Sequence, residues 1–484
     1  MRHAAKSLVL LLLAIASYAT AKVKYPGCKQ YMYRLTLRDK QESPYHLDHP
    51  TRWLSQRSVE RRRRQGLQID STDLPVSPQY LKTIRAQQDV SIVGTSRWNN
   101  TVLTCSKDTL ALQKLAGLPF VTKAALVWIS PDSIDHKELL RERYHNYFNP
   151  WDSVKQERYG GGKEQIESIL GHRLHGIGMR GKGMVIAVLD GGFQNTNSIP
   201  ALYGARIDGF RDMIWQNPKL PHPANPDEQI FYEGDHGTRV FSAMAANVPE
   251  VLVGTAPEAS YWLIRCEDQY TEQPVEEDYW AMAAELADSA GVDIINSSLG
   301  YNEYDPPHKS LRLRDLDGHS TLISRSASML ARKGIILVNS AGNSGMAPWK
   351  KICVPADAHD ILTIGALNRQ GKSAPFSSVG PSQDGRVKPD VVAIGAPVVL
   401  ISGRGAVVRD MGTSFSTPVV CGLVACLWQA LPGKTATDII RLIRQTADNN
   451  DAPDNVFGYG KPNFWKAYMV GKLKEERKLF DNGK

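Results

Sequence analysis

The stretch GTSFSTP, Gly412 to Pro418, constrains the fold of this chain more than any other segment. It is a turn of small residues that runs directly into the apolar sequence VVCGLVACLWQAL, so it places Ser414 in the first turn of a buried helix. A helix N-terminus offers unpaired N–H groups and a positive dipole end, and both stabilise an anion that forms beside Ser414. Because a serine hydroxyl is a poor nucleophile at neutral pH, it needs a base and an acid that orients the base. The segment therefore predicts a nucleophilic serine with partners elsewhere in the chain.

Three upstream residues have the right chemistry and local setting for those partners. Asp190 follows the apolar run Met184 to Leu189, so it is expected at the carboxyl end of a buried strand, where ligands bind in open α/β sheets. His236 precedes a sequence that reads as a helix and is the expected base. Asn343 follows another apolar strand and a glycine, and its side-chain amide is expected to donate a hydrogen bond to an oxyanion.

Taken together, these residues resemble the subtilisin-like serine protease family. The chain order Asp, His, Ser is the order of subtilisin and differs from that of chymotrypsin and the α/β-hydrolases. The serine motif reads Gly-x-Ser-x-Ser, which also disfavours an esterase with Gly-x-Ser-x-Gly. Further matches to the family, spread over roughly residues 165 to 470, are GTAP (Gly254 to Pro257), NSSLG (Asn296 to Gly300), FSSVG, KPDVVAIG and GYGKPN (Gly458 to Asn463).

The resemblance implies a role for each residue. Ser414 attacks the scissile carbonyl, His236 accepts and later returns the proton, and Asp190 holds the imidazolium. Asn343 and the Ser414 backbone N–H bind the tetrahedral oxyanion. The residues implied to bind substrate are Ser298, Leu299 and Gly300, read as a strand that pairs with the substrate backbone, and Ala341 and Gly342 on the opposite wall of the specificity pocket.

One position departs from the family pattern, which has Ser or Thr after the catalytic aspartate. Here Gly191 and Gly192 follow Asp190, so a hydroxyl contact to the carboxylate is lost. All four catalytic groups are nevertheless present, and the sequence predicts a serine endopeptidase. The alternative is a catalytically silent protein that keeps the fold and only binds peptides.

The length of 484 residues exceeds one ordinary domain. The predicted fold class is α/β, with a mostly parallel sheet flanked by helices, preceded by a small α+β prodomain. The predicted organisation is a signal peptide over 1–21, the prodomain over 22–130, a linker with a processing site over 131–165, the catalytic domain over 166–470 and a charged tail over 471–484.

The N-terminus reads as a secretory signal. Arg2 and Lys6 precede the apolar run LVLLLLAIA, and an AxA cleavage site follows at Ala19 to Ala21. The apolar run is too short for a membrane anchor. The expected location is outside the cytoplasm, either periplasmic or extracellular, with no membrane anchor after signal removal.

Charge separates the two expected domains. Residues 22–150 hold 21 Lys and Arg against 12 Asp and Glu, a net charge of +9, whereas residues 151–484 carry a net charge of −3. This contrast predicts that the prodomain docks electrostatically on the catalytic domain and inhibits it until the linker is cut. The alternative is a permanently attached accessory domain. The arginines in LSQRSVERRRRQG (Arg57 and Arg61 to Arg64) read as a solvated amphipathic helix, so no nucleic-acid partner is expected, and the alternative is a dibasic processing site.

Within the prodomain, local patterns predict the elements of the α+β unit. The segments YMYRLTL, DVSIVGTSRWNNTVLTC and KAALVWI read as strands, and DTLALQKLAGLP reads as a helix before the last of them. The glycines at 160–162 end the expected linker, and GGGK there does not match a phosphate-binding loop because Glu164 occupies the Ser/Thr position.

Six cysteines in an exported chain permit disulfides, and Cys28 and Cys105 are the pair considered inside the prodomain. Cys421 and Cys426 read as buried thiols behind Ser414. The cysteine and histidine spacing matches no zinc site, so no catalytic metal or other cofactor is expected. Structural calcium, which is common in the family, has no legible ligand loop here. The expected partners are protein or peptide substrates and the chain's own prodomain, and the expected state is a monomer.

Overall fold

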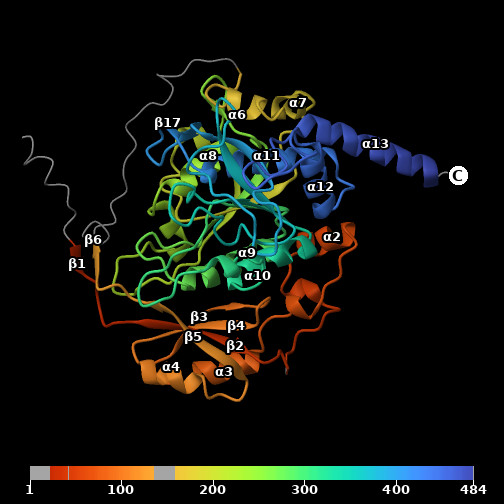
Figure 1. Cartoon of the computed structure of the whole chain (residues 1–484). Helices are drawn as coiled ribbons and strands as arrows, with labels where there is room; N and C mark the ends of the chain where they lie inside the picture. The colour runs from red at the N-terminus through yellow and green to blue at the C-terminus, as the bar shows by residue number, and fades with distance from the viewer. Residues whose placement is uncertain (1–21, 42, 136–157, 483–484) are drawn as a thin grey trace, which may run out of the picture.

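The structure is a computed structural model that describes residues 22–41, 43–135 and 158–482. We call residues 22–135 the N-terminal domain and residues 158–482 the main domain (Figure 1). The predicted signal peptide and most of the predicted linker lie outside the described residues.

A seven-stranded sheet forms the centre of the main domain, with the strand order β15-β14-β13-β12-β7-β11-β8. Every neighbouring pair in it runs parallel. Parallel sheets are covered on both faces, which is why these strands read as nearly continuous apolar runs. The strands are β7 (Val185–Asp190), β8 (Arg206–Asp212), β11 (Ser260–Arg265), β12 (Ile294–Ser297), β13 (Ile336–Ser340), β14 (Leu362–Asn368) and β15 (Val391–Ala396). The predicted α/β fold class is confirmed.

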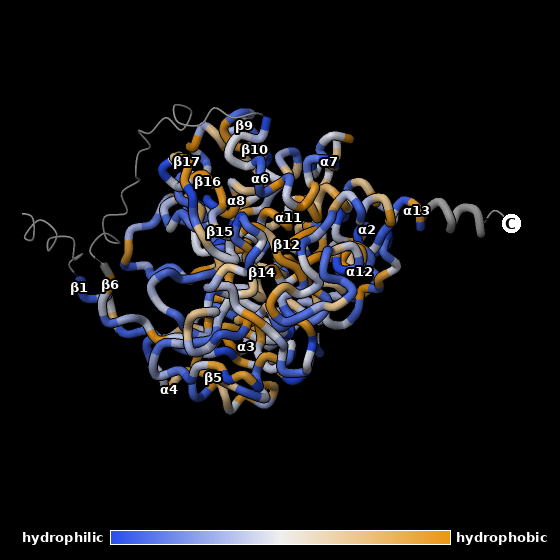
Figure 2. Tube along the Cα trace, turned by 45° about the horizontal axis from the view of Figure 1, so that its top comes forward, coloured by the Kyte–Doolittle hydropathy of each residue, from blue (hydrophilic) through white to orange (hydrophobic). Residues whose placement is uncertain are grey.

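Helices cover both faces of this sheet. On β7, Ile186 and Val188 pack with α8 and α11, whereas Ala187 and Leu189 pack with α9 and α10 on the other face. Figure 2 shows the hydrophobic residues gathered at the interior strands and α11. The helices of the main domain are α6 (Lys163–Glu167), α7 (Gly171–Gly176), α8 (His236–Ala245), α9 (Val275–Ala290), α10 (Leu322–Met329), α11 (Thr413–Ala430), α12 (Ala436–Thr446) and α13 (Phe464–Asn482).

Shorter elements complete the main domain. Two antiparallel pairs lie outside the central sheet, β9 (Asn247–Val248) with β10 (Leu252–Val253) and β16 (Val398–Ile401) with β17 (Val407–Asp410). In length and composition α11 would suffice to cross a membrane, but 94% of that helix is buried inside the protein.

The N-terminal domain is a four-stranded antiparallel sheet in the order β3-β4-β2-β5. The strand β2 spans the whole of YMYRLTL, and KAALVWI lies within β5, but a turn at residues 97–100 divides the predicted strand segment DVSIVGTSRWNNTVLTC into β3 and β4. The elements are β1 (Lys22–Lys24), β2 (Tyr31–Leu37), α2 (Gln56–Arg64), α3 (Pro78–Arg85), β3 (Ser91–Ser96), β4 (Thr101–Ser106), α4 (Thr109–Leu115), β5 (Val121–Ile129) and β6 (Ser133–Asp135), with β1 pairing antiparallel to β6.

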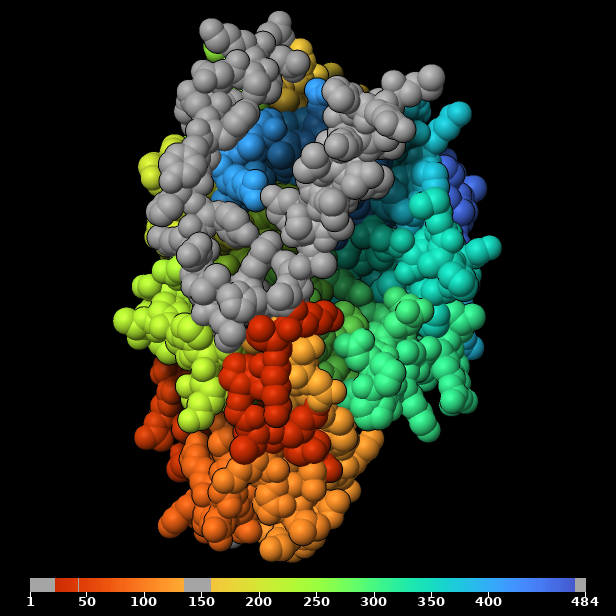
Figure 3. All heavy atoms as spheres, turned by 90° about the vertical axis from the view of Figure 1, so that its left-hand side faces the viewer, coloured from red at the N-terminus to blue at the C-terminus, as the bar shows by residue number. Residues whose placement is uncertain are grey.

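The two faces of this sheet have different partners. Leu35 and Leu37 face the domain's own helices α3 and α4, whereas Met32 faces the main domain and packs with Tyr279 of α9. This alternation follows from the period of two along a strand. Figure 1 shows the result, with the N-terminal domain in red and orange seated against α9 and α10, and Figure 3 shows the same domain packed against the main domain.

Ion pairs join α2 to α9. The buried Asp288 carboxylate accepts hydrogen bonds from Arg61, from Arg62 at 2.9 Å and from Arg97 at 2.7 Å. Burial alone would raise the pKa of Asp288, but these three guanidinium groups hold it well below its ordinary value. A further interdomain pair joins Arg34 to Asp278 on α9.

The prediction that the arginine-rich helix is solvated is therefore wrong. Arg61 and Arg62 are 0% and 1% exposed, and the exposed arginines are Arg63 and Arg64 at the C-terminal end of the helix. A charge pattern shows that a helix is polar, but it does not show that the oppositely charged partner lies on a helix far along the chain. The expected electrostatic contact between the domains takes the form of these buried pairs.

Asp288→Asn is expected to weaken the association of the two domains by two orders of magnitude or more. The substitution keeps the shape of the side chain but leaves the buried Arg61 guanidinium without its anion, a loss of roughly 3–5 kcal/mol, whereas Arg62 keeps its pair with Asp73. A specific protease site placed in the segment 136–157 would allow the chain to be cut and fragment dissociation to be followed by size exclusion. The control is Asp451→Asn, an exposed turn residue of the main domain. Equally tight fragments in both variants would contradict the role of Asp288.

The disulfide considered between Cys28 and Cys105 is not formed. Both are free thiols, Cys28 exposed and Cys105 buried. Cys105 lies in β4 on the face packed against the main domain, and its thiol lies 3.7 Å from Gln30 Oε1. Cys421 and Cys426 are buried free thiols, as expected.

Candidate active site

The four predicted catalytic residues come together at the carboxyl edge of the parallel sheet. Asp190 is the last residue of β7, and His236 is the first residue of α8. Asn343 follows the end of β13, and Ser414 is the second residue of α11. Strands end and helices begin at this edge, so polar side chains and free helix N–H groups converge there.

Asp190 and His236 form the tightest pair of the site. The His236 Nδ1 lies 2.8 Å from Asp190 Oδ1, and the Gly191 backbone N–H donates to the same oxygen at 2.8 Å. The carboxylate is fully buried, whereas 40% of the imidazole side chain is exposed. With Nδ1–H donating to Asp190, the Nε2 lone pair of His236 is left to accept a proton.

Ser414 lies at the N-terminus of α11 beside this pair. Its neighbour Phe415 packs on the imidazole of His236, with ring centroids 5.5 Å apart. The Ser414 hydroxyl donates to the Ser298 carbonyl at 3.2 Å, and the Ser298 hydroxyl donates to the Ser414 carbonyl at 2.8 Å. No hydrogen bond joins Ser414 to His236 among the described residues; such catalytic bonds often tighten only when substrate binds.

Asn343 is held through its amide oxygen, and its amide nitrogen donates no hydrogen bond within residues 22–41, 43–135 and 158–482. Its Oδ1 accepts from the Thr413 backbone N–H and from the Thr413 hydroxyl, both at 2.9 Å. Since the oxygen is fixed in this way, Nδ2 takes the other end of the planar amide group, and a methyl group built on Gly412 would lie 3.7 Å from this nitrogen. The donor therefore lies at the start of α11, next to Ser414.

The two predicted substrate-binding segments lie near the start of α11, where Ser414 and Asn343 meet. Ser298 to Gly300 continue from β12, and Ala341 and Gly342 continue from β13. The interpretation of Ser298 to Gly300 as a strand needs correction, because β12 ends at Ser297, where its pairing with β7 and β13 also ends. The Leu299 carbonyl instead accepts from the Ser340 hydroxyl at 3.2 Å, which ties the two segments together.

A carboxylate that the sequence analysis missed lies beside the Asp190–His236 pair. Glu267 Oε2 would be 2.8 Å from a methyl group built on Gly191, and Gly192 faces the Glu233 backbone equally closely. The backbone of Glu233 and Gly234 leaves no room for a side chain at Gly192, whereas a side chain at Gly191 would meet only the carboxylate end of Glu267. The two adjacent glycines were the sequence signal for this close approach.

Charge around the imidazole shifts two pKa values. Burial alone would lower the pKa of His236, but Asp190 and then Glu267 raise it to about 9. Burial, together with the charge of Asp190, raises the pKa of Glu267 to about 7, against the opposing effect of His236. Glu267 is thus a second anion acting on the same imidazole, charged mainly above pH 7.

Glu267→Gln is expected to move the acid side of the pH–activity curve to lower pH. A base must be neutral to act, so activity rises as His236 loses its proton, and removing the Glu267 charge lowers the pKa of that proton. We compare the activity at pH 8 with the plateau activity of the same protein at high pH. This ratio is expected to be on the order of threefold to tenfold larger for the variant than for the wild type. Below about pH 6 the two curves should converge, because Glu267 is then protonated. Glu250→Gln, at an exposed turn, is the control; a variant curve that moved to higher pH would contradict this assignment.

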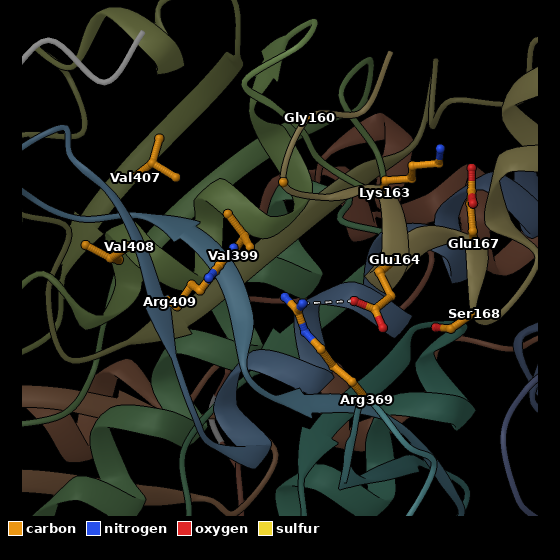
Figure 4. Close-up of a pocket in the computed structure, with 11 residues that line it drawn as sticks. Gly160, Lys163, Glu164, Glu167, Ser168, Arg369, Val399, Val407, Val408 and Arg409 are labelled. Carbon is orange, nitrogen blue, oxygen red and sulfur yellow. Dashed lines mark ion pairs between the residues drawn. The ribbon is translucent and has the colours of Figure 1, made fainter. Parts of the chain in front are cut away.

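A separate cavity of about 790 Å³ lies at the start of the main domain, between α6 and the β16–β17 hairpin. Figure 4 shows Glu164 and Arg369 facing each other in it, 3.2 Å apart. Glu164, which occupies the Ser/Thr position after GGGK, therefore forms an ion pair with Arg369. Among the residues that the structure describes, no group of three or more His, Cys, Asp or Glu side chains is placed to hold a metal ion.

Comparisons with known proteins agree with this architecture. The model of the Subtilase family matches residues 181–460, and the model described as Peptidase S8 propeptide domain, Bacteroidota, matches residues 32–142. The two matches define a serine peptidase domain preceded by its propeptide. The chain belongs to the subtilase family of serine proteases.

Two individual relatives and one solved structure have sequence identities to this chain between 21% and 29%. The chain is 29% identical over 287 residues to the thermophilic serine proteinase of Bacillus sp. (strain AK1), which covers 59% of this chain and 61% of the relative. It is 26% identical over 319 residues to serine protease AprX of Bacillus subtilis (strain 168), covering 60% of this chain and 67% of the relative. The solved structure of the prenylagaramide maturation protease PagA is 21% identical, with a TM-score of 0.48, over 62% of this chain and 98% of that one.

Proposed function

We propose that this protein is an exported serine endopeptidase, made as an inactive precursor, that hydrolyses peptide bonds with Asp190, His236 and Ser414. The observation that carries the proposal is the 2.8 Å contact between His236 and the buried Asp190, next to a serine at the N-terminus of a buried helix. The family membership supports the same chemistry.

In the proposed reaction Ser414 Oγ bonds to the scissile carbonyl carbon while its proton passes to His236 Nε2. Asp190 stabilises the imidazolium that forms. The carbonyl oxygen becomes an oxyanion, which accepts hydrogen bonds from Asn343 Nδ2 and the Ser414 backbone N–H. The C–N bond then breaks as the amine takes the proton from His236, which leaves an acyl-enzyme. Water hydrolyses that ester by the same route.

The N-terminal domain is the proposed intramolecular inhibitor. It matches a propeptide family model and is fastened to α9 by the buried pairs around Asp288. The segment that would be cut, in the predicted linker, lies outside the described residues, as does the signal on which the proposed export rests.

Casein hydrolysis with a fluorophosphonate block tests the function directly. The processed wild-type protein is expected to cleave casein, and prior treatment with the fluorophosphonate, which reacts with an activated serine oxygen, is expected to stop it. Cleavage that resisted the reagent would argue against a serine nucleophile. Peptide binding by a processed protein that cleaves no casein would favour the silent peptide-binding alternative.

A further inference from the structure

A cavity of about 550 Å³ lies between the two domains, where α10 lies next to the antiparallel sheet (Figure 1). Residues of β2, β4 and β5 line one side of it, and residues of α10 and of the turn after α10 line the other. The Asn99 side-chain amide, also in the lining, donates to the Ser326 hydroxyl of α10 at 2.8 Å, so the two domains touch beside the cavity. Its volume is in the usual range of small-molecule sites. This cavity exists only while the domains are assembled.

The charged side chains that line this cavity are basic, and no Asp or Glu is among the described residues of the lining. Arg34 and Lys123 come from the N-terminal domain, and Arg325 and Arg332 come from the main domain. Arg34 is neutralised by its pair with Asp278. The other three form no ion pair with any carboxylate that the structure describes. Unpaired cations from both domains therefore meet in one cavity.

Arg325 is held in place with half of its donors available. Its Nη1 donates to the His319 and Ser320 carbonyls, at 2.9 and 3.2 Å, which fixes the guanidinium. Its Nε and Nη2 donate to no residue in the described part of the chain. These two nitrogens form one side of the guanidinium fork, which matches two oxygens of a phosphate group. The geometry of Arg325 thus suits a phosphate ligand.

A further donor in the lining lacks an acceptor. Trp98 is 6% exposed, and its indole nitrogen has no hydrogen-bond partner among the described residues. A buried donor without an acceptor is uncommon, and a ligand rich in acceptor oxygens would supply what this region lacks. A single phosphate group would fill only a small part of the cavity and would not reach three separate cations. A chain of phosphates carries several charges and many acceptors in a compact volume.

We propose that this cavity binds a small oligophosphate anion, either free or as the phosphate chain of a nucleotide, and that the bound anion holds the N-terminal domain on the main domain. Because the cations come from both domains, the anion binds the assembled chain and not the separated domains. By mass action, the anion at a hundred times its Kd lowers the dissociation constant of the two domains by about a hundredfold. Release of the N-terminal domain therefore depends on the anion as well as on cleavage of the chain.

Calorimetric titration with inorganic tripolyphosphate, ATP and inorganic phosphate, in a phosphate-free buffer, tests the site. The full chain carries Ser414→Ala, so that self-cleavage cannot remove the N-terminal domain. Tripolyphosphate is expected to bind one to one, and inorganic phosphate at least about tenfold more weakly, because it makes fewer charge-assisted hydrogen bonds.

One variant from each domain shows whether the site bridges them. Lys123→Gln and Arg332→Gln, both at exposed positions without an ion pair, are each expected to weaken tripolyphosphate binding by on the order of tenfold. Arg85→Gln is the matched control, because Arg85 is an exposed arginine of α3 that does not line the cavity. It removes the same charge and should bind as tightly as the parent chain.

The outcomes of the titration are distinct. Tighter binding of ATP than of tripolyphosphate would identify a nucleotide, whose base would contact the apolar lining at Leu322 and Met329. Equal affinities would identify the phosphate chain alone. Absence of binding by either compound, binding that Lys123→Gln and Arg332→Gln leave unchanged, or an equal loss in Arg85→Gln would overturn the site.

Fragment dissociation tests the retention of the N-terminal domain. The same chain, cut at a specific protease site placed in 136–157, is analysed by size exclusion with and without tripolyphosphate at a hundred times its Kd. The dissociation constant of the fragments is expected to fall about a hundredfold, and Arg332→Gln should reduce this gain. Equal dissociation constants with and without the anion would overturn the retention. Neither measurement uses peptidase activity, so a failure of the proposed function would be seen separately, as absence of casein cleavage.

Discussion

Ser414→Ala is expected to remove nearly all peptidase activity, a loss of roughly a millionfold in kcat, the size known for subtilisin itself. The substitution deletes the oxygen that would form the acyl-enzyme while α11 keeps its start, because the N-cap region is held by Thr413 and Asn343 and not by Ser414. Steady-state hydrolysis of a chromogenic peptide measures the loss.

His236→Ala is expected to cause a loss of the same order, and the double variant should be no worse than either single variant. The reason is that the base acts only by taking the proton of Ser414, so removing both members removes one function. Ser416→Ala makes the matched control in the same helix, since the Ser416 hydroxyl donates to the Thr413 carbonyl within that helix. Casein cleavage by Ser414→Ala at the wild-type rate would contradict the assignment, and so would losses that multiply in the double variant.

Asn343→Leu is expected to lower kcat by on the order of a hundredfold to a thousandfold with little change in KM, the range for the corresponding donor of subtilisin. The Asn343 amide nitrogen would meet an oxygen that is charged only in the transition state, so the ground-state complex is not weakened. Kinetics over a range of substrate concentrations separate the two constants.

A second variant distinguishes catalysis from architecture at this position. Asn343→Asp keeps an oxygen that can accept from Thr413 but has no N–H to donate, so it should be as defective as Asn343→Leu. Recovery of activity in Asn343→Asp would mean that Asn343 acts by anchoring Thr413. A raised KM at unchanged kcat would place Asn343 in substrate binding instead.

Local patterns were sufficient to predict the elements that carry the site. The apolar run before Asp190 is β7, the helix after His236 is α8, and the small-residue turn before Ser414 opens α11. Each of these predictions depended on residues within one element and its boundary, where periodicity and turn chemistry act. The roles of these residues in catalysis stay predictions.

Long-range contacts could not be read in the same way. The burial of Arg61 and Arg62 depends on Asp288, more than two hundred residues later in the chain. The position of Glu267 likewise depends on which segment lies next to the Gly191 backbone. A glycine at such a position indicates that another part of the chain packs closely against its backbone, but the sequence does not show which residue that is.

Intact-mass spectrometry of the wild type and of Ser414→Ala, each treated with the same fluorophosphonate, tests the central claim most directly. The wild type is expected to appear as a trimmed main domain that carries one adduct, on the peptide containing Ser414. Ser414→Ala is expected to keep its N-terminal domain covalently attached and to carry no adduct. An adduct on a different serine, labelling of Ser414→Ala, or an unlabelled wild type would contradict the proposed nucleophile.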